Sequence, residues 1–312
     1  MSRTDVETRE TRETRETRET RETRATFRFD AIGAPWSIDT REPLDEDARG
    51  AVLERIDRFD RVWSRFRPDS LVSRVAAEPG TWVFPPEASP LFDLYRTLHD
   101  RTAGSVSPLV GHRLEDLGYD RRYSFVEANG GAPVPPWDDR VRWDGTSLTT
   151  RIPVLLDVGA AGKGYLVDIV AGILGDFGVD DYVVDASGDL VHRGPEAIRV
   201  ALEHPLDATM AVGVVELRNA AICASASNRR AWGQGLHHII DATTGAPTTA
   251  VIATWAIARH ALHADGLATA LFFADHATLA NGFGRPFTFQ SVRMLGTGHL
   301  EASTPFDGEL FA

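Results

Sequence analysis

Lys163 is the only lysine in the chain; all other residues among the 33 lysines and arginines are arginine. A lysine that persists against such a bias indicates a position that needs a compact, rotatable ammonium rather than a planar guanidinium. Lys163 stands between two glycines, and Asp157 precedes this run of small residues. An acidic protein that handles an anionic ligand needs a local cation, either Lys163 or a metal ion.

The turn that carries Lys163, residues 159–164, has small side chains like a phosphate-binding loop. A Walker A loop also has a glycine five residues before its Gly-Lys pair and a Ser or Thr after it. Those two positions hold Asp157 and Gly164, so the chain does not match. A tight turn at the N-terminus of a predicted helix remains, and its N–H groups can face a phosphate. Helix–strand packing is the alternative reason for the glycines.

His238 and Asp241 place an imidazole and a carboxylate near the end of a predicted strand. They are three residues apart, so on a regular strand they face opposite sides and need not touch. An imidazole that is neutral near pH 7 can take a proton from a hydroxyl, which makes His238 the candidate general base. Asp241 could orient His238 or replace it. A purely structural histidine is the alternative.

Asp265 and Thr269 are four residues apart at the start of a predicted helix, so their oxygens lie on one face. A carboxylate and a hydroxyl suit a hard cation such as Mg²⁺, which prefers oxygen ligands and recruits substrate phosphates. A helix cap is the alternative role for Asp265. The sequence has neither a Ser-His-Asp signature nor a zinc-binding helix.

Lys163 lies in a predicted unit of strand, turn, helix and strand. Apolar residues predict a buried strand over 152–158 and a helix over 164–177, with an inner face of Leu166, Ile169, Val170, Ile173 and Phe177. Alternation and helical spacing predict the remaining elements: a strand pair over 27–38 broken at Gly33, helices over 44–66, 90–103 (capped at Ser89) and 263–274, and strands over 182–185, 197–203, 210–217, 236–241 and 285–295. This mixed order predicts an α+β fold.

The ends and the composition limit the function classes. Residues 8–24 repeat Thr-Arg-Glu without an apolar face, so residues 1–26 are predicted to be a disordered tail before one domain over 27–312. The net charge of −12 disfavours nucleic acid as a partner. Cys223 is the single cysteine, which excludes an intrachain disulfide. No signal peptide, lipid-anchor cysteine or membrane span is recognisable, so a cytoplasmic protein is expected.

Seven stretches, in order over roughly residues 27–300, resemble motifs of the ApbE family, flavin transferases that attach FMN from FAD to proteins. They are 29–34 (F-x-A-M-G-T), 63–74 (S-x-Y-R-P-D-S-E-I-S-R), 102–109 (S-G-G-A-F-D-P-T), 156–168 (L-D-L-G-G-I-A-K-G-Y-A-V-D), 185–189 (N-A-G-G-D), 238–245 (H-I-I-D-P-x-T-G) and 264–269 (A-D-A-L-A-T). The chain departs from them at Ile32, Ala34, Phe66, Ser107, Ser187 and 224–226. These departures concern the surroundings of the flavin and of the acceptor.

The resemblance implies an α+β, T-fold-like arrangement of mixed sheets and flanking helices, with FAD as the substrate in a cleft between two lobes. It implies a Mg²⁺ site, with Mn²⁺ possible, formed by Asp265, Thr269 and the carbonyl of Ala160. It implies FAD contacts from a further set: Ile32, Phe66, Ala103, Gly104, Asp157, Lys163 and His238.

The implied partner is an acceptor flavoprotein with a target Thr or Ser, whose hydroxyl attacks the FMN-side phosphorus while AMP leaves. Mg²⁺ and Lys163 would neutralise the phosphates, and His238 or Asp241 would act as the base. Two alternatives remain at this level. One is Mg²⁺-dependent hydrolysis of FAD to FMN and AMP, and the other is a flavin-binding protein without catalysis.

Overall fold

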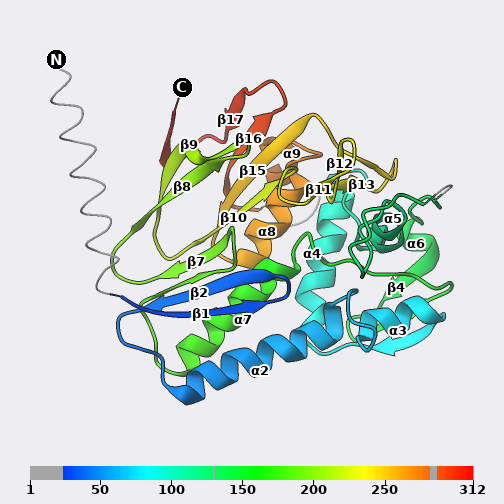
Figure 1. The fold of residues 1–312 in the computed structure, drawn as a ribbon, viewed down its shortest axis with the longest axis horizontal. Coiled ribbons are helices and arrows are strands. Elements are labelled where there is room, and N and C mark those ends of the chain that lie inside the picture. Colours follow the sequence, from blue (N-terminus) through cyan, green and yellow to red (C-terminus); the bar gives the residue numbers. More distant parts are fainter. Residues whose placement is uncertain (1–23, 129–130, 282–286, 312) are drawn as a thin grey trace.

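The computed structural model describes residues 24–128, 131–281 and 287–311, and Figure 1 shows their arrangement. Most of the predicted tail over 1–26 lies outside the described residues, as do 285 and 286 of the predicted last strand. The first described strand, β1, spans Ala25–Ala31 and so begins two residues before the predicted domain start. The mixed helices and antiparallel sheets confirm the α+β prediction.

The centre of the fold is an antiparallel sheet with the strand order β1-β2-β6-β7-β10-β15-β16-β17. The predicted strand pair is confirmed as the β1–β2 hairpin, in which Phe29 stands opposite Trp36 and their rings stack 5.9 Å apart. The other strands have these bounds: β2 Ala34–Thr40, β6 Tyr182–Asp185, β7 Asp189–Arg193, β10 Ala221–Ala226, β15 Val251–Ala258, β16 Gln290–Leu295 and β17 Leu300–Ala302.

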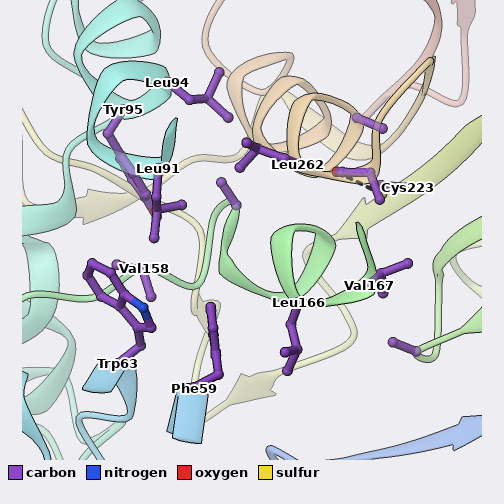
Figure 2. Packing of buried hydrophobic residues seen from close by; sticks show 14 of the residues in the cluster. Phe59, Trp63, Leu91, Leu94, Tyr95, Val158, Leu166, Val167, Cys223 and Leu262 are labelled. Carbon is purple, nitrogen blue, oxygen red and sulfur yellow. Dashed lines mark hydrogen bonds between the residues drawn. The ribbon is translucent and has the colours of Figure 1, made fainter. Parts of the chain in front are cut away.

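Helices cover one face of this sheet. α7 (Gly162–Asp176) and α8 (Ala261–Ala270) lie directly on it, while α2 (Glu46–Trp63) packs on α7 and α4 (Ala88–Arg101) on α8 (Figure 1). Figure 2 shows the core at the junction of these helices. Side chains from all four helices meet there: Phe59 and Trp63 from α2, Leu91 and Tyr95 from α4, Leu166 from α7 and Leu262 from α8. Each helix therefore buries an apolar stripe of the kind that the sequence spacing predicts.

The opposite face of the sheet is covered by a second, three-stranded sheet of β8 (Ile198–His204), β9 (Asp207–Leu217) and β18 (Gly308–Leu310). Leu202 and Val215 of this small sheet pack against Trp255 and Val292 of the large one. The predicted strands over 197–203 and 210–217 are thus confirmed, and β9 is longer than predicted. The layers are helices, large sheet and small sheet.

A second lobe, on the right of Figure 1, contains the sheet β3 (Gly80–Val83), β5 (Ser147–Thr150) and β4 (Val141–Trp143). Short helices complete it: α3 (Leu71–Ala77), η1 (Pro108–Val110), α5 (Gly111–Asp116) and α6 (Trp137–Arg140). The remaining short elements are β11 (Ala231–Trp232), β12 (Leu236–His237), β13 (Ile240–Asp241), β14 (Ala246–Pro247) and α9 (His276–Asn281). Among the described residues, no helix is long and apolar enough to cross a bilayer.

Four predictions about local structure are wrong. Within 152–158, Val154, Leu155, Leu156 and Val158 are buried, but the stretch forms no strand, because an apolar run alone does not distinguish a strand from a buried irregular segment. The stretch 236–241 is split into β12 and β13. Phe177 is 44% exposed, since α7 ends before it. Ser89 lies inside α4, whose N-cap is Glu87.

Gly164 is the point where α7 and α8 approach most tightly. A Cβ added there would lie 2.3 Å from the carbonyl oxygen of Ala261 and 2.5 Å from the Cβ of Asp265. Such distances require a backbone shift, and overpacking typically costs ~1–3 kcal/mol or more. Gly164→Ala should therefore lower the free energy of unfolding by at least ~2 kcal/mol in urea melts.

Gly172, in the same helix, supplies the matched control. It is exposed, and a Cβ added there meets no atom within 4 Å. Gly172→Ala should stabilise the protein by about 0.5–1 kcal/mol, because alanine loses less conformational freedom in a helix than glycine does. Equal stabilities of the two variants would contradict the close approach of α7 and α8.

Candidate active site

A cleft of about 1010 Å³ lies between the two lobes. One side comes from the β1–β2 turn, the β6–β7 turn and the segment after β10; the other comes from residues 64–67 and 105–125. The N-terminal turn of α7 and the inner face of α8 form its floor. Of the predicted site residues, the cleft is lined by Ile32, Phe66, Asp157, Ala160, Lys163, His238, Asp265 and Thr269.

Lys163 is held in the first turn of α7 by acceptors on the β6–β7 turn. Its Nζ lies 3.1 Å from Oδ2 of Asp189 and donates to the carbonyl oxygens of Ala186 (2.8 Å) and Ser187 (3.2 Å). Burial would lower the pKa of Lys163, but the charges of Asp189 and Asp265 outweigh burial and raise that pKa. Two carbonyl oxygens that accept hydrogen bonds and one carboxylate at ion-pair distance surround the ammonium, and a compact, rotatable cation suits such a site better than a planar guanidinium.

Asp189 is a site residue that sequence reasoning did not single out. It begins β7, is 1% exposed and lines the cleft beside Lys163. In the sequence it was only the last residue of the stretch 185–189, at a turn where acidic residues are common. Its burial, which marks it as more than a turn residue, depends on the packing of α7 over the sheet.

Asp157 is fixed by the other lobe. Nε of Arg65 donates to Oδ2 of Asp157 at 2.6 Å, and the N–H of Gly159 donates to Oδ1 at 2.7 Å. Burial would raise the pKa of Asp157, but the charge of Arg65 and the Gly159 bond outweigh burial and lower that pKa. Arg65 is itself buried and also donates to the carbonyl oxygen of Tyr119. This pair therefore joins the lobes beneath the cleft.

The three predicted metal ligands lie close together. The Thr269 hydroxyl donates to the carbonyl oxygen of Ala160 at 3.4 Å, and Oδ2 of Asp265 accepts from the N–H of Gly164 at 2.8 Å. Burial and the nearby charge of Asp189 raise the pKa of Asp265 well above its usual value. Two buried carboxylates thus share one ammonium, that of Lys163, and a divalent cation would supply the missing positive charge.

This donor set suits a hard cation of the Mg²⁺ type. A carboxylate, a hydroxyl and a backbone carbonyl supply only oxygen, and Mg²⁺ normally completes its shell with waters and substrate phosphates. No group of three or more His, Cys, Asp or Glu side chains with metal-binding geometry occurs in the described part of the chain. The geometry therefore does not support a metal site made by protein side chains alone.

His238 lies between β12 and β13 and lines the cleft, and its backbone N–H donates to the carbonyl oxygen of Arg230 (3.3 Å). Its Nδ1 is buried and has no hydrogen-bond partner among the described residues. Burial, followed by the charges of Arg230 and His237, lowers the pKa of His238 to about 3. The imidazole is therefore neutral at pH 7, as a general base must be, but weakly basic without substrate.

Asp241, Ala103 and Gly104 are not among the residues that line the cleft. Oδ1 of Asp241 accepts from the N–H (2.8 Å) and the hydroxyl (2.7 Å) of Thr243, so the carboxylate closes its own turn and makes no bond to His238. Ala103 and Gly104 have left-handed backbone conformations after α4, and a Cβ at Gly104 would contact Thr243. Together they support the neighbouring Ser105, which does line the cleft.

An aromatic cluster forms the wall of the second lobe. Phe66 stacks on Tyr123 at 5.2 Å, and Tyr119 stacks on Trp232 at 5.6 Å. The guanidinium of Arg65 lies over both Phe66 and Tyr119. Only Phe66 was predicted, from the motif resemblance. The other rings lie in a loop and a short hairpin without periodicity, so the sequence carried no signal that they meet.

Comparisons with known proteins identify the family. A family model described as the ApbE family matches residues 32–282. An FAD:protein FMN transferase of Klebsiella pneumoniae is 28% identical over 255 residues, or 75% of this chain and 73% of that protein. One of Vibrio cholerae is 33% identical over 266 residues, or 79% and 77%.

The fold gives the same result. The solved structure of the flavin transferase ApbE from Vibrio cholerae superimposes with a TM-score of 0.75 at 22% identity, over 91% of this chain and 98% of that chain. The α+β architecture with a cleft between two lobes is therefore the fold of those structures. The chain belongs to the ApbE family.

Proposed function

We propose that this protein is an FAD:protein FMN transferase that uses Mg²⁺ and modifies a Thr or Ser hydroxyl of an acceptor flavoprotein. The hydroxyl oxygen forms a bond to the FMN-side phosphorus of FAD, the bond from that phosphorus to the bridging oxygen breaks, and AMP leaves with the bridging oxygen. The hydroxyl proton passes to a base on the protein. Membership of the ApbE family supports the activity, and its relatives named above carry this activity in their names.

One observation supports the site assignment most strongly. The same cleft is lined by three kinds of group: oxygen atoms that could bind a cation, the buried carboxylates of Asp189 and Asp265 with only one ammonium between them, and the neutral imidazole of His238. A dinucleotide diphosphate brings the negative charge and the oxygen ligands that such a site needs. The aromatic wall offers flat apolar surfaces for its rings.

Asp265, Thr269 and the carbonyl of Ala160 would hold Mg²⁺, which supplies charge neutralisation for the diphosphate. Lys163 keeps Asp189 and the β6–β7 turn in place beside these oxygens. Its three donors already have protein acceptors, so its proposed role shifts from direct phosphate contact toward organising the site. Asp157, with Arg65, fixes the turn that carries Ala160.

His238 would accept the hydroxyl proton at Nε2. His238→Ala should lower the rate of transfer about a hundredfold or more at pH 7, in the range that general bases contribute. The free imidazole stays neutral down to about pH 3. The acid limb of kcat/KM for FAD, which reports the free enzyme, should therefore not show loss of this base near pH 6.5. Near wild-type transfer by His238→Ala would exclude the assignment.

Asp241 remains the alternative base. Its carboxylate is occupied by Thr243, so His238 is preferred.

The test of the function is incubation of the purified protein with FAD and Mg²⁺, with and without a candidate acceptor domain, followed by chromatography of the nucleotides. AMP release that requires the acceptor and matches the flavin attached to it is the expected result. Free FMN and AMP in both arms would instead establish hydrolysis of FAD. Bound, intact FAD in both arms would establish a flavin-binding protein.

A further inference from the structure

Five cationic side chains line the cleft: Arg65, Arg67, Lys163, Arg229 and Arg230. Four of them have a carboxylate partner, namely Arg65 with Asp157, Arg67 with Asp69, Lys163 with Asp189 and Arg229 with Glu203, all at 3.1 Å or less. Arg230 has no carboxylate within ion-pairing distance in the described part of the chain. A cation left free in a cleft of a protein with a net charge of −12 is available to an anionic ligand.

We propose that Arg230 binds the AMP-side phosphate of FAD and stabilises it as the leaving group, an assignment that rests on the proposed function. Arg230 is exposed just before the hairpin β11–β12, and its guanidinium lies 5.9 Å from the ring centre of Tyr119. Tyr119 also lines the cleft, so the cation lies beside the cleft's aromatic wall. A guanidinium can make two parallel hydrogen bonds to a phosphate, and no carboxylate in the described part of the chain competes for it as Asp189 does for Lys163.

The position of Arg230 also connects substrate binding with His238. The backbone carbonyl of Arg230 accepts from the N–H of His238. Burial lowers the pKa of the imidazole most, and the charges of Arg230 and His237 lower it further, while the backbone of Arg230 and the charge of Asp157 raise it. When a phosphate offsets the charge of Arg230, this repulsion is relieved. His238 then becomes a stronger base only when FAD is present.

The direct test is calorimetric binding of ADP and of riboflavin to the wild type and to Arg230→Gln, Arg230→Lys and Arg199→Gln. ADP carries the AMP phosphate together with the phosphate next to it, and riboflavin carries no phosphate. Arg230→Gln should weaken ADP binding roughly 10- to 100-fold, the loss expected for a charge-assisted hydrogen bond, and leave riboflavin binding unchanged. Arg230→Lys should recover part of the affinity. Arg199→Gln removes an exposed cation of β8 that does not line the cleft, and should bind ADP as the wild type does.

Kinetics supply a second readout. Arg230→Gln should lower kcat in the transfer assay as well as raise KM for FAD, because a leaving-group contact strengthens in the transition state. Unchanged ADP affinity in Arg230→Gln, or an equal loss for riboflavin, would overturn the assignment even if the wild type transfers FMN. A wild type that binds neither ADP nor FAD would overturn both this assignment and the proposed function.

Discussion

Asp265→Asn should lower FMN transfer by about two to three orders of magnitude, the range for loss of a major electrostatic stabiliser of the transition state. Asparagine keeps the size of the side chain and can still accept the hydrogen bond from Gly164. What it removes is the one anionic ligand of the proposed Mg²⁺ site. Initial rates measured over a range of Mg²⁺ concentrations should show that much higher concentrations are needed for the residual activity.

Stability separates this loss from simple damage to the fold. Asp265 is 4% exposed and shares its surroundings with the buried Asp189, so without metal its charge is unfavourable. Metal-free Asp265→Asn should be at least as stable as the wild type in thermal melts, and Mg²⁺ should raise the melting temperature of the wild type only. Asp275→Asn, at an exposed helix-capping position that does not itself line the cleft, is the control. Equal Mg²⁺ stabilisation of Asp265→Asn and the wild type would place the ion elsewhere.

Lys163→Met should be the most damaging single change for both stability and transfer. It leaves the carboxylate of Asp189, 1% exposed, without the ammonium that lies 3.1 Å from it, and breaking a buried pair from one side costs about 3–5 kcal/mol. The bonds to Ala186 and Ser187, which fix the β6–β7 turn, are lost as well. Urea unfolding gives the stability, and the transfer assay gives the activity.

Two further variants make this result specific. Lys163→Arg should also be impaired, because a planar guanidinium cannot reach the three acceptors in their three directions. Arg61→Met breaks an exposed pair with Asp57 at 2.8 Å, and should cost less than about 1 kcal/mol. A Lys163→Met variant as stable as Arg61→Met would show that the pair of Lys163 and Asp189 does not stabilise the fold.

The sequence predicts the long elements of the fold well because their patterns are local. The helices α2, α4, α7 and α8 each have an apolar stripe of helical spacing, and the ends of each lie within a few residues of the prediction. The prediction of a strand over 152–158 was wrong for a physical reason. Its burial comes from neighbouring helices and loops, and a sequence pattern records burial without recording which backbone partners satisfy it.

The candidate site likewise contains residues that the sequence predicted and residues that it did not. Lys163, His238 and Asp265 come from stretches recognisable by composition or by motif order, and the structure places all three on one cleft. Asp189 and the proposed role of Arg230 were missed, because they depend on which charged groups have partners after folding and which do not. Asp241 was chosen for its nearness to His238 in sequence, and the turn that it closes with Thr243 directs it away.

The central claim is that FMN, and not AMP or free flavin, ends on the acceptor protein. The intact mass of a candidate acceptor after reaction with FAD and Mg²⁺ tests it most directly. We expect the acceptor mass to increase by the mass of one FMN less one water, and we expect no increase when the target Thr or Ser is replaced by Ala. A gain corresponding to AMP would show attack on the other phosphorus. An unchanged acceptor mass with FAD consumed would contradict transfer altogether.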